Sequence, residues 1–148
     1  MAGPCILVVD DELSFRLFLK TLFETGGYQV IVARNGREGL EKARNARPAC
    51  IVLDVMMPER GGLEMYRELK HSPELRNIPV VMLSAVAAAG FTHALSMIGL
   101  SAGDLPSPEA YVEKPPHPGP LLEVVYGLIG RPPISYDFQP GKGTPQGV

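Results

Sequence analysis

Side chains that can do chemistry end or follow four short apolar runs of this sequence. The acidic pair Asp10–Asp11 follows the first of these runs, Asp54 ends the next, and Ser84 and Lys114 follow two later ones. Taken singly, each has an ordinary role as a helix-start acid, a helix cap or a solvated surface charge. Taken together, the residues do not fit these ordinary roles, because carboxylates crowded at one place repel one another unless a cation lies between them. Carboxylate oxygens suit Mg²⁺, and a metal beside one carboxylate, with a hydroxyl and a lysine opposite, suits phosphoryl transfer to that carboxylate.

The apolar runs have the length of strands and alternate with stretches of helical periodicity. Cys5–Val9 is a continuous apolar run, typical of a strand covered on both faces. Further strands are expected over 28–33, 50–54, 79–83 and 111–113, and helices around 15–23, 40–46, 63–69, 85–98 and 121–129. This alternation predicts right-handed crossovers and a doubly wound parallel α/β sheet with helices on both faces. Functional residues of such sheets lie beyond the carboxyl ends of the strands, so the five side chains are expected at one edge.

Length and composition indicate one folded domain followed by a tail. The chain has 148 residues, of which 45% are hydrophobic and 20% charged, which excludes a wholly disordered protein. We expect a domain over 1–130 and a tail over 131–148, because that last stretch contains four Pro and three Gly and has no periodicity.

The charge and the cysteines bear on partners and compartment. A net charge of −2 speaks against nucleic-acid binding, and no apolar run approaches the roughly 20 residues of a membrane span. The start of the chain lacks the pattern of a signal peptide. Cys5 and Cys50 are expected to be reduced, buried thiols in the cytoplasm.

Four motifs, in this order, resemble those of response-regulator receiver domains of two-component signalling. They are Val8-Val9-Asp10-Asp11-Glu12, then Leu53-Asp54-Val55-Met56-Met57-Pro58 with Gly62, then Leu83-Ser84-Ala85, then Lys114-Pro115. Each motif is weak alone, but each ends an expected strand, and the resemblance covers roughly residues 5–130. It implies the flavodoxin-like strand order 2-1-3-4-5. A receiver domain is itself a standard example of a doubly wound sheet with this order.

The resemblance implies a phosphoryl acceptor and a metal site. Asp54 would accept the phosphoryl group. Asp11 would bind Mg²⁺ directly and Asp10 through water, with Asp54 and the backbone carbonyl of Met56 completing the protein ligands.

The resemblance also implies the residues that respond to phosphorylation. Lys114 would pair with Asp54 at rest and with the phosphoryl oxygens afterwards, and a cis Lys114–Pro115 bond would aim it. Ser84 would move to hydrogen-bond a phosphoryl oxygen. Tyr111 would change rotamer together with Ser84.

The function implied is a phosphorylatable switch in a phosphorelay rather than an enzyme with separate substrates. The domain would take a phosphoryl group from a histidine kinase or a His-containing phosphotransfer protein and catalyse only its own phosphorylation and dephosphorylation. It would signal to a downstream protein through an altered docking surface, with no nucleic-acid or membrane partner. A homodimer could form through the fourth strand, fourth helix and fifth strand, or through the tail.

Departures from the family pattern leave alternatives open. Pro116, Pro118 and a long stretch between Ser84 and Lys114 put the fourth helix and its surface in question. One alternative is a phosphorylation-independent interaction module on the same fold. The intact acidic pair and lysine argue against this alternative. Another is an enzyme or cofactor binder. A haloacid-dehalogenase-like phosphatase would need an aspartate where Met56 stands, and a flavodoxin would need a phosphate-binding loop where the acidic pair stands.

Overall fold

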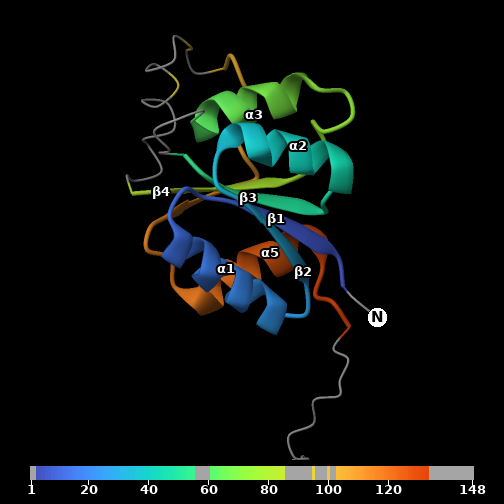
Figure 1. The fold of residues 1–148 in the computed structure, drawn as a ribbon, viewed down its shortest axis with the longest axis vertical. Coiled ribbons are helices and arrows are strands. Elements are labelled where there is room, and N and C mark those ends of the chain that lie inside the picture. The colour runs from blue at the N-terminus through green and yellow to red at the C-terminus, as the bar shows by residue number, and fades with distance from the viewer. Residues whose placement is uncertain (1–2, 56–60, 86–94, 96–99, 101–102, 134–148) are drawn as a thin grey trace, which may run out of the picture.

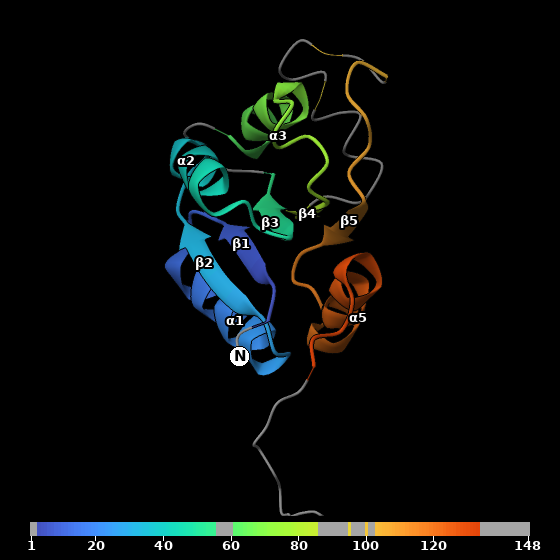
Figure 2. The same cartoon turned by 90° about the vertical axis from the view of Figure 1, so that its right-hand side faces the viewer.

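A five-stranded parallel sheet forms the centre of the protein. The computed structural model describes residues 3–55, 61–85, 95, 100 and 103–133. Its strands run in the predicted order β2-β1-β3-β4-β5, as Figure 2 shows. Their bounds are β1 Cys5–Val9, β2 Gln29–Ala33, β3 Cys50–Asp54, β4 Val80–Ser84 and β5 Ala110–Glu113. All the pairings are parallel, so the carboxyl ends of the strands share one edge.

Helices cover both faces of the sheet (Figure 1). One face carries α1 (Leu13–Thr25) and α5 (Pro118–Ile129), and the other carries α2 (Gly36–Ala46) and α3 (Gly62–His71). Each face buries its own apolar cluster, and the central strands contribute alternate residues to both. The continuous apolar runs of the sequence follow from this, because both faces of these strands are shielded from water. The helix expected over 85–98 falls outside the described residues, apart from Ala85 and the buried Leu95.

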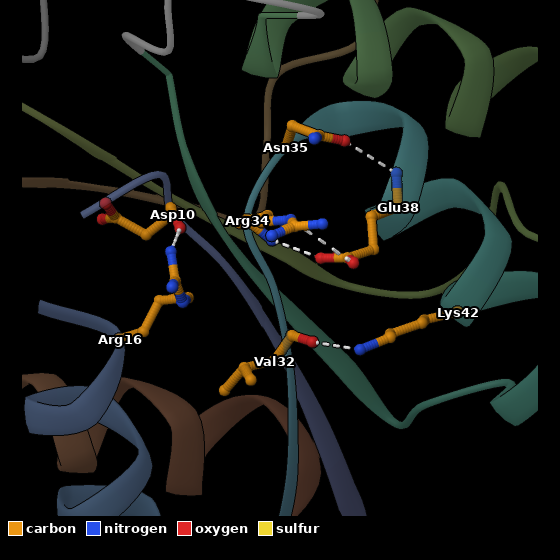
Figure 3. Close-up of polar contacts among 7 residues, drawn as sticks. All are labelled: Asp10, Arg16, Val32, Arg34, Asn35, Glu38 and Lys42. Carbon is orange, nitrogen blue, oxygen red and sulfur yellow. Dashed lines mark hydrogen bonds and ion pairs between the residues drawn. The ribbon is translucent and has the colours of Figure 1, made fainter. Parts of the chain in front are cut away.

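Two helix starts differ from the sequence prediction. Helix α2 begins at Gly36 rather than at 40, and the side chain of Asn35, directly before it, accepts a hydrogen bond from the Glu38 amide (Figure 3). The Glu38 carboxylate accepts in turn from the Arg34 amide, so two backbone donors are satisfied at this end. Helix α5 begins at Pro118 rather than at 121, because proline fits the first helical turn, where its missing N–H has no partner to lose.

The two cysteines are free, as expected, but they are not equally buried. Cys50 is fully buried in the cluster beneath α1 and α5. Cys5 is only half-buried, since it opens β1 at the amino edge of the sheet, where less of the chain covers it. Among the helices that the structure describes, none is long and apolar enough to cross a membrane.

Candidate functional site

Three carboxylates meet at the carboxyl edge of the sheet, as the sequence predicts. Asp10 directly follows β1 and Asp54 is the last residue of β3, and both side chains are buried. Asp11 is exposed beside them. One carboxylate oxygen from each of the three lies within 4.8 Å of the others. Such a donor set of hard oxygens suits a cation of the Mg²⁺ or Ca²⁺ type, whereas zinc sites are built mainly from nitrogen and sulfur.

Lys114 supplies a positive charge to this acidic cluster. Its Nζ lies 3.0 Å from Asp10 Oδ2 and 3.4 Å from Asp54 Oδ2. Burial lowers the pKa of Lys114, but the hydrogen bond to Asp10 and the charges of Asp54 and Asp10 outweigh burial and raise that pKa above its ordinary value. The family resemblance implies the pairing with Asp54. The contact with Asp10, which is the shorter of the two, comes from the structure alone.

Strands β4 and β5 bring Ser84 and Lys114 to the same edge. Ser84 is fully buried at the end of β4, and its backbone carbonyl accepts a 2.7 Å hydrogen bond from the Lys114 amide. Tyr111 lies opposite Met82 in the register of β4 and β5, and its half-buried side chain packs against the cluster beneath α2 and α3. The Lys114–Pro115 peptide bond is cis, as the resemblance implies.

Gly62 allows α3 to begin directly against the end of β3. A Cβ atom at this position would overlap the backbone carbonyl oxygen of Asp54. Any side chain here would therefore push α3 away from the acidic edge.

Two residues of α1 contact the site and were not predicted from the sequence. Arg16 donates a 2.8 Å hydrogen bond from its guanidinium to the backbone carbonyl of Asp10 (Figure 3). The ring of Phe15 faces the Lys114 ammonium, with 4.3 Å from Nζ to the ring centroid. Their spacing in the sequence could have identified them, because residues five and six positions after Asp10 fall on the first turns of the helix that leaves this edge. Met56, expected to offer a backbone carbonyl, lies outside the described residues.

The strand order and the acid–lysine site together define a receiver-type α/β domain. A family model described as the response regulator receiver domain matches residues 6–125, and the chain belongs to this family. It is 37% identical over 130 residues to the polar-differentiation response regulator DivK of Brucella anthropi, a match that covers 88% of this chain and 98% of the relative. Members of this family are phosphorylatable signalling switches of two-component systems rather than enzymes with separate substrates.

Solved structures agree with the fold. Chemotaxis protein CheY4 of Vibrio cholerae superposes with a TM-score of 0.71 at 28% identity, over 86% of this chain and 99% of that one. The receiver domain of the sensor histidine kinase PA1611 from Pseudomonas aeruginosa, solved with a magnesium ion in its active-site cleft, superposes with a TM-score of 0.74. At 24% identity over 87% of this chain and 99% of that domain, it shows likeness of fold.

Proposed function

We propose that Asp54 accepts a phosphoryl group from a phosphohistidine on a histidine kinase or a phosphotransfer protein. A carboxylate oxygen of Asp54 bonds to phosphorus while the bond from phosphorus to the imidazole nitrogen breaks, and that nitrogen keeps the electron pair. The observation that carries this proposal is the position of Asp54, buried at the end of β3 between two further carboxylates and a lysine. The site's own residues assist this transfer and the later hydrolysis.

Asp10, Asp11 and Asp54 hold Mg²⁺ in this proposal, together with the backbone carbonyl of Met56. The donor set supports it, because three carboxylate oxygens offer the hard ligands that this ion takes. When bound, the ion neutralises charge that develops on the phosphoryl oxygens.

Lys114, Ser84 and Tyr111 convert phosphorylation into a changed surface. Lys114 is already beside Asp54, so its ammonium can pair with the phosphoryl oxygens after a small movement. The Ser84 hydroxyl donates a hydrogen bond to a phosphoryl oxygen, and the Tyr111 ring follows by changing rotamer. Since Tyr111 lies on β5, this movement alters the β4–β5 face, on which a downstream protein or a second copy of the chain would dock.

The phosphoryl donor docks on α1. Among the described residues, the large apolar side chains that are exposed are Leu13, Leu17 and Phe18, all on this helix. Helix α1 starts at the acidic edge, so an apolar partner helix lying on this patch would bring its phosphohistidine close to Asp54. We expect the exchange in the cytoplasm, where the free thiols of Cys5 and Cys50 stay reduced.

Mass spectrometry after incubation with acetyl phosphate and Mg²⁺ tests the proposal. The wild-type protein should gain the mass of one phosphoryl group. Asp54→Asn should gain none, and Asp11→Asn should lose the dependence on Mg²⁺ together with most of the labelling. Labelling of Asp54→Asn at the wild-type rate would refute the assignment. A wild-type protein that stays unlabelled and still captures its partner would favour the phosphorylation-independent interaction module.

A further inference from the structure

Lys114 is held at the site from a third side, by an aromatic ring. Its Nζ lies 4.3 Å from the centroid of Phe15, on α1, in addition to its contacts with Asp10 and Asp54. This distance is well within the roughly 6 Å over which an ammonium is attracted to the face of a ring. The attraction is strongest when the cation is largely removed from water, and the Lys114 side chain is 17% exposed.

The ring itself is fixed by its surroundings. Phe15 is half-buried and packs against the apolar cluster beneath α1 and α5. It also contacts the ring of Phe18, with 5.7 Å between centroids. The next residue, Arg16, ties the same turn of α1 to the backbone carbonyl of Asp10 (Figure 3). These contacts fix the position of the Phe15 ring relative to Asp10, one of the two carboxylates that contact the ammonium.

A ring face suits a lysine that has to turn between partners. The lysine side chain is long and flexible, and its ammonium is strongly hydrated, so two carboxylates alone leave it free to swing towards water. The attraction of a ring face depends weakly on the direction of the N–H bonds. The ammonium can therefore turn from Asp10 towards a group on Asp54 without losing its contact with the ring.

We propose that Phe15 is a positioning residue for Lys114. The Phe15 ring keeps the ammonium at the acidic edge and thereby lowers the barrier to phosphorylation of Asp54. The second part rests on the function proposed above, in which Lys114 pairs with the phosphoryl oxygens. The first part, the placement of the ammonium, stands on the geometry alone. A role of Phe15 limited to core packing is the competing explanation.

Three variants separate these explanations. Phe15→Leu keeps an apolar side chain but removes the ring, and Phe15→Tyr keeps the ring. The control is Tyr126→Leu. Tyr126 lies on α5, and its half-buried ring, which this change removes, lies 4.0 Å from the Arg131 guanidinium. Thermal unfolding should show that all three variants fold.

The first measurement is the proton shift of the Lys114 ε-methylene group, assigned by its absence from the spectrum of Lys114→Met. The ring face should move this signal upfield in the wild-type protein, in Phe15→Tyr and in Tyr126→Leu. The signal should return towards that of a free lysine in Phe15→Leu. A Lys114 shift that is the same in Phe15→Leu as in the wild type overturns the proposal.

The second measurement is the rate of phosphorylation by acetyl phosphate with Mg²⁺. Phe15→Leu should be slower by about three- to tenfold, with Phe15→Tyr and Tyr126→Leu close to wild type. Equal slowing by Phe15→Leu and Phe15→Tyr would overturn the proposal in favour of packing. If Lys114→Met is phosphorylated as fast as wild type, the effect on the phosphorylation barrier fails, whereas the function proposed for Asp54 fails only if Asp54→Asn is labelled. The ε-methylene shift still decides whether Phe15 positions the ammonium.

Discussion

The ammonium of Lys114 lies closer to Asp10 than to Asp54, at 3.0 Å against 3.4 Å. The residue proposed to sense phosphorylation at Asp54 is therefore also the partner of a proposed metal ligand. One positive charge compensates two buried carboxylates, and a divalent cation at the same edge competes with it.

Replacing Lys114 by Met should tighten the binding of Mg²⁺. Removal of one positive charge beside the cluster should lower the dissociation constant by about two- to tenfold, because that charge no longer repels Mg²⁺. Isothermal titration calorimetry measures the change. The control is Lys20→Met, which removes an exposed lysine that pairs with Glu24 on α1 and should leave the dissociation constant unchanged.

The same Lys114→Met protein should be folded but destabilised when Mg²⁺ is absent. Asp10 and Asp54 then remain buried without their cation, and Mg²⁺ should restore most of the lost melting temperature. A loss that Mg²⁺ does not restore would show that Lys114 is mainly a structural ion-pair partner.

Gly62→Ala should destabilise the domain, by about 2 kcal/mol or more, because the new Cβ would overlap the carbonyl oxygen of Asp54. Gly127→Ala, within α5, is the matched control. A Cβ there meets nothing within 4 Å, so the change should stabilise the helix by up to about 1 kcal/mol. Urea unfolding of the two variants compares them directly, and a loss of similar size in both would contradict the close approach of α3 to β3.

Tyr66→Phe should loosen the segment that precedes β5. The Tyr66 hydroxyl donates a 2.7 Å hydrogen bond to the backbone carbonyl of Pro106, and its loss should cost about 1 kcal/mol. Faster amide hydrogen exchange over 103–109 would report the loosening. Tyr28→Phe is the control, because it removes a bond of the same length to the carbonyl of Gly130, beyond the end of α5, and should leave exchange over 103–109 unchanged.

Stability should fall at high pH through Cys50. Burial, with a further contribution from the charge of Glu109, raises the pKa of this thiol from 9.0 to about 12. Between these values the unfolded chain releases the proton and the folded protein keeps it, so the free energy of unfolding decreases as pH rises from 9.0 towards about 12. Urea unfolding at pH 8 and pH 10 should show a smaller decrease for Cys50→Ala than for wild type. Equal decreases in the two proteins would mean that Cys50 does not contribute.

Removal of the tail should leave the phosphorylation chemistry intact. Chains that end after Gly130 and after Pro133 should both be phosphorylated by acetyl phosphate at the wild-type rate. The shorter chain should melt at a lower temperature, because it lacks the contact of Arg131 with the Tyr126 ring and the buried Pro132. A slower phosphorylation rate in either chain would show that the tail assists the acidic edge.

The sequence by itself determined the parallel α/β sheet and the three carboxylates, and the resemblance of its motifs to receiver domains implied the strand order. Continuous apolar runs such as Cys5–Val9 and Cys50–Leu53 predict buried parallel strands, and parallel strands bring the residues at their carboxyl ends to one edge. Because these acids end such a run or follow it within two residues, the convergence of Asp10, Asp11 and Asp54 followed from topology without any side-chain coordinates.

Only the tertiary structure decided which groups surround the Lys114 ammonium. A lysine side chain can reach several neighbours, and sequence spacing along different elements does not rank them. The packing of α1 on the sheet brings the Phe15 ring over Nζ and the Arg16 guanidinium to the carbonyl of Asp10. Both residues also match the helical pattern of an ordinary core-facing turn, so their contacts depend on how one element packs against another, a relation that local periodicity does not encode.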